Sequence, residues 1–498
     1  MYQSRHQSSA NGPPLRTLTA DADVARWLVD GGDERLRLDA LGRNRYGVGP
    51  MPETGGLSFG SSTASTISAG AFEAARARLE AIRGCASPRA AYHAGAAEIR
   101  ARLAGLCALA PSAADDIILA ASGTDLHLIA ADLARGDGSR QLVSVMAEPG
   151  ETGRGVANAL RSRRYATASP YGPAASVDAP LSEAPAAGLL AVPLREACGA
   201  PRDAATVDAD FEAAVGKAVA TRGAVLLIMV DVSKTGLAAP SAQCAVRLKA
   251  RHGAALTVMV DACQFRLSAE SLGDYLAAGF LVAVTGSKFV GGPPFSGALL
   301  LPPSEAAHLH RAPISPALGD YCARADWPAG FIARSVLPDV QSFGLLLRWE
   351  AALHELEAFR RIPSERLHAA LEQVAAVVEA RLATRAFEAL PVPRIDRSGR
   401  AGWDATPTLF PFLVHGAQGL LPAARTQALY QALSDERVLL GQPVPVGRRG
   451  GQPASALRLA ISARQLVEAT HGPDAAQALV ARIEETFDFV AARAAALG

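Results

Sequence analysis

The chain has 498 residues, and its 49 Lys and Arg against 48 Asp and Glu leave a net charge of +1 at pH 7. A balance so close to neutral argues against a nucleic-acid-binding surface and against an acidic tail. No apolar run approaches the roughly 18 residues of a membrane span, and the polar first 20 residues do not resemble a secretory signal. The six cysteines are scattered without metal-ligand spacing, which predicts free thiols, no metal site and a cytoplasmic location.

The N-terminal part is predicted to be mixed loop and helix. Residues 1–18 are rich in Ser, Gln, Gly and Pro, which is typical of a disordered arm. A helix is expected over 21–41, followed by a Gly-rich loop over 42–68. Helical periodicity recurs over 72–82 and 90–109.

The middle of the chain alternates short apolar runs with helical stretches. Runs such as AVLLIMV and LTVMV are almost continuously apolar, as strands of a parallel sheet covered on both faces are. Alternation of this kind predicts right-handed crossovers and an α/β sheet with helices on both sides. The predicted strands are 116–120, 141–146, 188–193, 224–230, 256–260, 280–284 and 298–301.

The pattern changes near residue 338. Long amphipathic helices are expected over 340–358 and 364–390, followed by the strand TLFPFLV, a helix over 423–433 and a late strand, RLAIS. Mixed strands and helices after a long linking helix fit a smaller α+β domain. The predicted division is a disordered arm at 1–18, an N-terminal segment with a substrate loop at 19–70, a large α/β domain at 71–337 and a small domain at 338–498.

The most informative pattern joins VDACQ at 260–264 to TGSK at 285–288. Asp261 ends an apolar run, and Lys288 lies in a small-residue loop 27 residues later. A lysine amine can form a Schiff base with a cofactor aldehyde, and an aspartate can keep a proton on a pyridine nitrogen. This pattern therefore indicates pyridoxal phosphate (PLP). The alternatives are a solvated loop lysine and an aspartate that caps a helix.

A second pattern, ASGTD at 121–125, follows one predicted strand and opens a helix. Hydroxyls and free backbone N–H groups at a helix start favour an anion such as phosphate. A plain helix cap is the alternative. No GxxxxGK[ST] pattern occurs, so a nucleotide P-loop is not predicted.

The order ASGTD, ETGRG, VDVSKTG, VDACQ, TGSK and LRLAIS resembles the class V aminotransferase and cysteine desulfurase superfamily, PLP-dependent enzymes of fold type I. The resemblance covers about residues 70 to 465, and VDACQ with TGSK is its most specific part. It implies an α/β fold with a mostly parallel sheet in the large domain, a smaller α+β C-terminal domain and a homodimer. In such a dimer Arg324 or Arg334 would reach the phosphate of the neighbouring subunit.

The resemblance also implies roles for individual residues. Lys288 would carry the cofactor as an internal aldimine, and Asp261 would pair with its pyridine nitrogen. Gln264 and Ser233 would approach the phenolic oxygen of the cofactor.

Further positions follow from the same resemblance. Gly123 and Thr124 would hold the phosphate, with help from Thr285. Arg458, in ALRLAIS, would bind the α-carboxylate of the substrate, because a guanidinium suits two-point contact with a carboxylate. Thr152 is expected to pack on the cofactor face, where relatives often have an aromatic ring.

The remaining candidates are two residues of the Gly-rich loop, one histidine and one cysteine. Tyr46 and Arg45, in the loop over 42–68, are candidate substrate-binding residues, and a solvated loop is the alternative. His127 is predicted to be structural, and Cys322 is predicted to be a core thiol. No cysteine lies in a Gly/Ser-rich loop of the kind that a persulfide-forming desulfurase needs.

Together these patterns predict a PLP-dependent enzyme of amino acid metabolism, with an amino acid as substrate and aminotransferase as the leading activity. The alternative is a PLP-dependent lyase or carbon–carbon bond-forming enzyme, either desulfurase-like or β-eliminating. A non-catalytic PLP-fold binding protein is a second alternative. The sequence leaves open which amino acid is used and which bond at Cα is broken.

Overall fold

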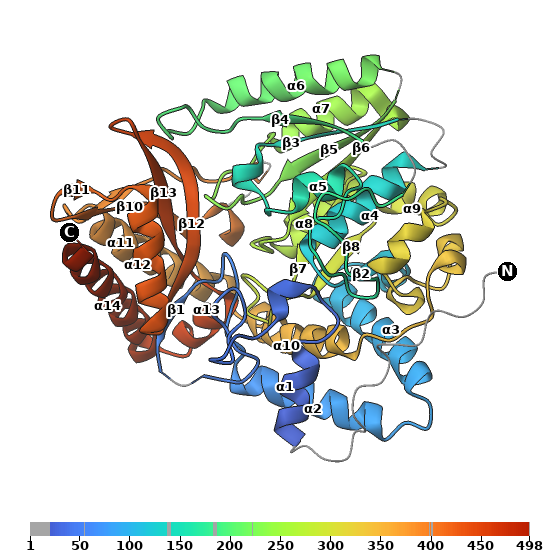
Figure 1. Ribbon diagram of the computed structural model, residues 1–498, viewed down its shortest axis with the longest axis horizontal. Helices are drawn as coiled ribbons and strands as arrows, with labels where there is room; N and C mark the ends of the chain where they lie inside the picture. The colour runs from blue at the N-terminus through green and yellow to red at the C-terminus, as the bar shows by residue number, and fades with distance from the viewer. Residues whose placement is uncertain are drawn as a thin grey trace.

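The computed structural model describes residues 20–53, 55–136, 141–182, 187–221, 223–397, 399 and 402–497. The predicted arm at 1–18 lies outside the described residues. Two sheets organise the chain, a larger one in its middle and a smaller one toward its C-terminal end (Figure 1). Among the described helices, none combines the length and the apolar character that crossing a membrane requires.

The larger sheet has seven strands in the order β2-β8-β7-β6-β5-β3-β4. All its neighbouring strands pair in parallel except β8, which runs antiparallel to both β7 and β2. The seven predicted strands all form, with ends that shift by two residues at most. They are β2 (Ile117–Ala120), β3 (Leu142–Ala147), β4 (Gly188–Val192), β5 (Ala224–Val230), β6 (Leu256–Ala262), β7 (Leu281–Thr285) and β8 (Gly297–Leu300).

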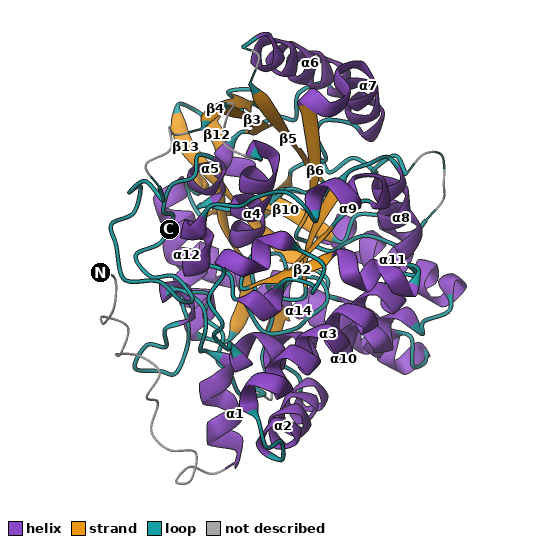
Figure 2. Ribbon diagram, turned by 90° about the vertical axis from the view of Figure 1, so that its right-hand side faces the viewer, coloured by secondary structure: helices purple, strands orange, loops and turns teal. Residues whose placement is uncertain are grey.

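Helices surround this sheet (Figure 2), and every residue of β5 is buried, as its continuous apolar sequence predicts. The helix α4 packs on β3, β5, β7 and β8, whereas α7 packs on β6 and α8 on β7. The helices of this part are α1 (Ala20–Leu28), α2 (Ala69–Arg83), α3 (Pro88–Leu106), α4 (Gly123–Arg135), α5 (Val156–Leu160), α6 (Ala204–Ala220), α7 (Ala242–His252), α8 (Ala269–Ala277), α9 (Pro303–Leu309) and α10 (Phe343–Arg360).

The smaller sheet has six strands, ordered β1-β12-β13-β10-β11 with β9 beside β10. The strand β1 comes from the N-terminal segment and pairs in parallel with β12, whereas the other pairs are antiparallel. The elements are β1 (Leu57–Phe59), β9 (Phe387–Ala389), β10 (Leu409–Gly416), β11 (Gly419–Leu420), β12 (Val438–Arg449), β13 (Gln452–Ala460), α11 (Ser364–Leu382), α12 (Ala423–Asp435), α13 (Ala463–Ala469) and α14 (Pro473–Leu497).

Two predicted helices were too long. The helix expected over 21–41 ends at Leu28, because the buried guanidinium of Arg348 binds the backbone carbonyls of Leu28, Asp30 and Gly31 at 3.2, 2.5 and 3.3 Å. The guanidinium thus supplies the hydrogen bonds that a further helical turn would otherwise give these carbonyls. Gly31 takes a φ of +69° as the chain turns away. The helix expected over 364–390 ends at Leu382, and its last residues form β9 instead.

Candidate active site

A cavity of about 230 Å³ lies at the carboxyl ends of the parallel strands of the larger sheet. Its other walls come from the N-terminal segment and from β12 and β13 of the smaller sheet. The structure brings all ten site residues selected from the sequence together around this cavity. They are Tyr46, Gly123, Thr124, Thr152, Ser233, Asp261, Gln264, Thr285, Lys288 and Arg458.

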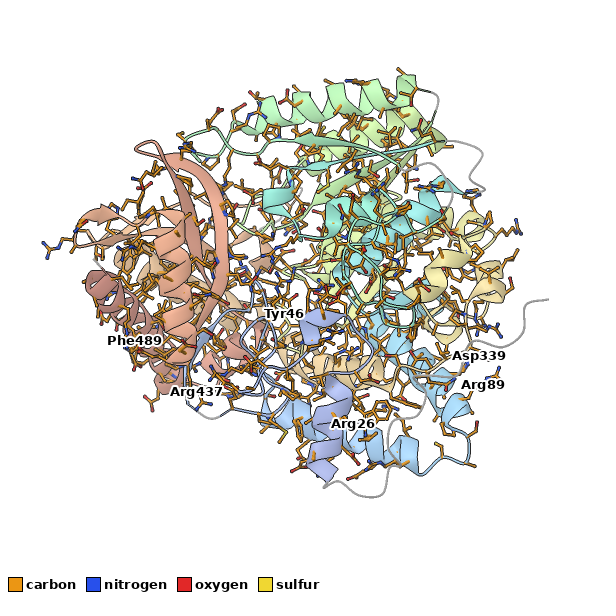
Figure 3. The ribbon with its side chains drawn as sticks, in the orientation of Figure 1. Arg26, Tyr46, Arg89, Asp339, Arg437 and Phe489 are labelled. Atoms are coloured by element: carbon orange, nitrogen blue, oxygen red, sulfur yellow. The ribbon has the colours of Figure 1, made fainter. Side chains whose placement is uncertain are left out.

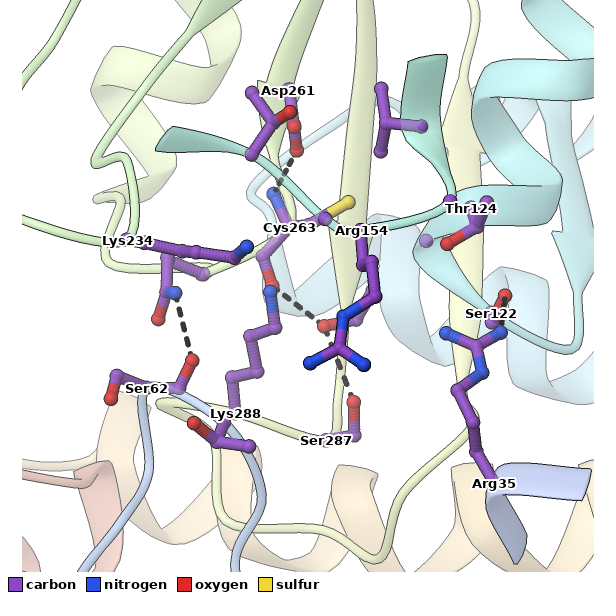
Figure 4. Close-up of a pocket in the computed structure, with 18 of the residues that line it drawn as sticks. Arg35, Ser62, Ser122, Thr124, Arg154, Lys234, Asp261, Cys263, Ser287 and Lys288 are labelled. Carbon is purple, nitrogen blue, oxygen red and sulfur yellow. Dashed lines mark hydrogen bonds between the residues drawn. The ribbon is translucent and has the colours of Figure 1, made fainter. Parts of the chain in front are cut away.

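Lys288 projects into the middle of this cavity from the loop between β7 and β8 (Figure 4). Its backbone carbonyl accepts a hydrogen bond from the Ser65 hydroxyl at 3.1 Å. The loop passes so close to α10 that a Cβ on Gly286 or Gly292 would lie 2.4 or 2.7 Å from the Cβ of Ala352. Small residues are therefore needed here for packing, and they hold the lysine at a fixed position.

Asp261, at the end of β6, is buried and paired with His127. Its Oδ2 lies 3.2 Å from Nε2 of His127, without a well-aligned hydrogen bond, and Nδ1 of His127 lies 2.7 Å from the Gly123 carbonyl. Burial alone would raise the pKa of Asp261, but His127 and the charge of Lys288 together hold that pKa well below its usual value. The carboxylate is therefore ionised.

His127 lies on the helix after the ASGTD turn, as predicted, and its contact with Asp261 adds to the expected structural role. His127 lines the cavity, one helical turn after Gly123 on α4. Residues four apart share a helix face, so the ASGTDLH segment did carry a signal that the histidine faces the same cavity as Gly123.

The start of α4 can serve both as a helix cap and as an anion site. The Ser122 hydroxyl accepts from the Asp125 N–H at 3.4 Å, and the Asp125 carboxylate accepts from the Ser122 N–H at 2.6 Å. This capping box leaves the N–H groups of Gly123 and Thr124 without helical partners beside the cavity. A Cβ on Gly123 would lie 2.7 Å from Sγ of Cys263, so the turn fits only with glycine.

Two hydroxyl groups that were predicted to contact the cofactor already donate hydrogen bonds to other groups of the protein. The Ser233 hydroxyl donates to Oε2 of Glu151 at 2.6 Å, and the Thr285 hydroxyl donates to the Cys263 carbonyl at 2.6 Å. Each hydroxyl has one proton to give. In this arrangement neither Ser233 nor Thr285 can donate a hydrogen bond to an oxygen of a ligand.

Thr152 and Gln264 keep donors that can face a ligand. The Thr152 hydroxyl is buried and has no hydrogen-bond partner within the described residues. The Gln264 amide nitrogen donates to the Ser62 carbonyl at 3.1 Å, which uses one of its two protons. A buried hydroxyl without a partner is costly, so a bound polar molecule would stabilise this wall of the cavity.

Arg458, on β13, is a buried guanidinium whose hydrogen bonds all go to neutral oxygens. It donates to the Gln442 carbonyl at 2.7 and 3.1 Å, to the Thr63 hydroxyl at 2.9 Å and to the Lys234 carbonyl at 3.3 Å. No carboxylate pairs with it in the part of the chain that the structure describes. Burial lowers the pKa of Arg458 to about 10, so the group stays charged and suits an anionic ligand.

Glu151 organises a buried network that the sequence did not reveal. Its carboxylate accepts from Nε of Arg195 at 2.8 Å and from the hydroxyls of Ser233 and Thr235, each at 2.6 Å. Arg195 lies 44 residues along the chain, so no local pattern links the two ions. The network fixes the VDVSKTG turn at the end of β5.

The N-terminal segment closes the cavity. Glu34, Arg35, Arg45 and Tyr46 line it, and Figure 3 labels Tyr46 near the middle of the molecule. Tyr46 packs against Leu36, Ala121 and Phe295 (all buried), whereas Arg45 is exposed. Cys322 is a buried core thiol outside the cavity, as predicted.

Comparison with known proteins shows what the fold is. No family model matches the chain, and no curated protein matches it. Many solved structures do match it, and three of them show the extent of the likeness. A variant of C-DES with glycine covalently linked to its PLP cofactor is 15% identical, over 86% of this chain and 96% of that one, with a TM-score of 0.53. A NifS-like protein is 13% identical over 87% and 100% (TM-score 0.54), and the Escherichia coli cysteine desulfurase CsdA is 14% identical over 87% and 95% (TM-score 0.52).

The likeness extends over most of the chain in each case, at low identity. It shows that the chain has fold type I of the PLP-dependent enzymes, which confirms the fold predicted from the sequence.

Proposed function

We propose that the chain is a PLP-dependent enzyme that acts on an amino acid and holds the cofactor covalently through Lys288. The observation that carries the proposal is that the Lys288 amine and the ionised Asp261 line the same cavity in a chain of this fold. When bound, PLP supplies an electron sink that weakens the bonds at Cα of an amino acid.

The residues of the cavity fit this cofactor. Asp261, kept ionised by His127, would hold the proton on the pyridine nitrogen. The free N–H groups of Gly123 and Thr124 would bind the phosphate at the start of α4. Thr152 would gain a partner for its buried hydroxyl, and the free amide proton of Gln264 is better placed than Ser233 to donate to the phenolic oxygen.

The chain supplies the substrate contacts and the proton carrier. Arg458 would bind the α-carboxylate, since its buried charge lacks an anion within the described residues. The Lys288 amine would accept and return the proton at Cα as a general base and acid. Tyr46 and the N-terminal segment would cover the substrate and limit access of water.

We infer transamination as the leading reaction, because the sequence resembles the class V aminotransferases and Lys288 can serve as the proton carrier. A lyase reaction is the second candidate, since the structure of C-DES described as a cystine C–S lyase has a TM-score of 0.53 with this chain. A persulfide-forming mechanism is less well supported. In the part of the cavity that the structure describes, Cys263 is the one cysteine, and burial raises the pKa of its thiol far above the usual value.

Borohydride reduction of the PLP-loaded protein, followed by peptide mapping, tests the proposal. We expect the pyridoxyl label on Lys288. A label on another lysine, or none, would reject the assignment. Incubation with single amino acids then distinguishes the reactions: a keto acid without free ammonia indicates transamination, and ammonia or sulfide indicates elimination. Label without any turnover would indicate the non-catalytic binding protein.

We also propose a homodimer in the cytoplasm. Closed two-fold dimers are the commonest oligomers. Arg324 and Arg334 lie outside this chain's cavity and bind each other's backbone carbonyls at 3.1 and 3.0 Å, so within one chain neither reaches the candidate phosphate site. All six cysteines are free thiols, as a reducing compartment favours. Light scattering during size exclusion tests the dimer, and a single-chain mass in the active fraction would reject it.

A further inference from the structure

The cavity contains a second amine, Lys234, in the turn that follows β5 (Figure 4). Its backbone is fixed on both sides: its N–H donates to the Glu151 carbonyl at 2.9 Å, and its own carbonyl accepts from Arg458 at 3.3 Å. Its two neighbours, Ser233 and Thr235, are bound to the Glu151 carboxylate. A flexible side chain therefore extends from a rigid turn into the cavity.

The Lys234 amine lacks a partner of opposite charge in the part of the chain that the structure describes. No carboxylate or other acceptor in the described residues bonds to it. The negative charge of Glu151 acts on this amine, but the Glu151 carboxylate is itself paired with Arg195. Burial and the positive charges of Arg458, Lys288 and Arg154 lower the pKa of Lys234 to about 8, while Glu151 opposes this shift.

Several cationic side chains line the cavity around Lys234. Arg154 and Arg458 also lack carboxylate partners among the described residues, whereas Arg35 is paired with Asp33. Like charges that face one cavity repel each other. A ligand that brings several negative charges would remove this repulsion.

The cofactor phosphate is poorly placed to satisfy Lys234. In the larger sheet, the phosphate-binding turn follows β2, Lys288 follows β7, Asp261 ends β6 and Lys234 follows β5. Because these strands lie in the order β2-β8-β7-β6-β5, Lys234 stands on the opposite side of Lys288 from Thr124, as Figure 4 shows. It stands instead beside Arg458, the candidate carboxylate-binding residue.

We propose that Lys234 binds a second acidic group on the substrate, so that the substrate is an amino acid with an anionic side chain. The inference rests on the proposed function, in which Arg458 binds the α-carboxylate. An ammonium is a compact charge that suits either a carboxylate or a phosphate. A charge-assisted hydrogen bond of this kind changes binding by about 10- to 100-fold.

Calorimetric titration of the PLP-loaded protein tests the proposal with pairs of similar shape: glutamate against glutamine, aspartate against asparagine, and O-phosphoserine against serine. We expect the acidic member of at least one pair to bind about 10- to 100-fold more tightly. The pair that shows the preference distinguishes a carboxylate from a phosphate. Lys234→Gln should abolish the preference, and Lys234→Arg should restore most of it.

Lys217→Gln is the matched control, because it removes the same charge from an exposed position on α6 and should leave the preference intact. Equal binding of all pairs by the wild-type protein, or a preference that survives Lys234→Gln, would overturn the proposal. The pyridoxyl label distinguishes failure of the role proposed for Lys234 from failure of the proposed PLP-dependent function. A label on Lys288 without acidic preference rejects the role of Lys234 alone, whereas absence of the label rejects the proposed function.

Discussion

The buried pair of Glu151 and Arg195 should show strong energetic coupling. Both side chains are at most 5% exposed, and their Oε1 and Nε atoms lie 2.8 Å apart. Glu151→Met leaves Arg195 with the Gly199 carbonyl and the Thr235 hydroxyl as its remaining partners. Removing one member of a buried ion pair costs about 3–5 kcal/mol of folding free energy. We therefore expect each single replacement to be strongly destabilising.

Replacement of both ions by apolar residues removes the uncompensated charge, and such exchanges are often close to neutral. We expect the double variant Glu151→Met/Arg195→Met to be more stable than either single variant. The coupling in the double-mutant cycle should then exceed about 3 kcal/mol, the usual upper limit for residues in contact.

Urea unfolding of the four proteins measures the cycle. Independent sites add to within about 0.5 kcal/mol, so additive effects of the two single replacements would refute the reasoning. The same variants also test whether Glu151 positions the turn after β5. Without Glu151 the Ser233 hydroxyl loses its acceptor. Substrate turnover should therefore fall by a larger factor than pyridoxyl labelling of Lys288.

The remaining predictions concern the reacting groups. Asp261→Ala should retain the label on Lys288 but lower turnover by about 100- to 1,000-fold, since a positioned charge is lost; near wild-type turnover would contradict this role. Arg458→Ala should raise KM for amino acids far more than for their amides, and an equal effect on both would remove Arg458 from the carboxylate site. Because the pKa of Lys234 is about 8, its charge is present below that pH and lost above it. The Kd of the preferred acidic amino acid should therefore rise between pH 8 and pH 9.5, and a flat profile that matches Lys234→Gln would contradict this.

The strands of the larger sheet were predictable because each is a short apolar run between polar turns. A short, continuously apolar segment such as AVLLIMV is typical of a strand that is buried on both faces. The residues that follow these strands were predictable for a related reason: carboxyl ends of parallel strands meet at one edge, so Asp261 and Lys288 reach the same cavity.

Contacts between distant segments could not be read from the sequence. The end of α1 depends on Arg348, which lies more than 300 residues away. The pairing of β1 with β12 likewise joins segments more than 350 residues apart, since Leu57 pairs with Val438. Helical periodicity and strand propensity report only the local chain, so neither contact leaves a local signal.

The hydrogen-bond partners of two hydroxyl groups could not be predicted for a different reason. Ser233 and Thr285 both reach the cavity, so their positions were predicted well. Their protons, however, go to Glu151 and to the Cys263 carbonyl. A sequence pattern locates an oxygen, but the direction of its proton depends on every acceptor around it.

The two sides of the cavity are built from different parts of the chain. The larger sheet carries the groups proposed for the cofactor, whereas Thr63, Gln442 and Arg458 are bonded to one another beside the smaller sheet. The bond from Arg458 to the Lys234 carbonyl joins this group to the turn after β5. Any change in the position of the smaller sheet relative to the larger one would therefore move Arg458 against Lys234. If Lys234 and Arg458 bind the two acidic groups as proposed, the distance between these cations would set the length of the acidic side chain that fits.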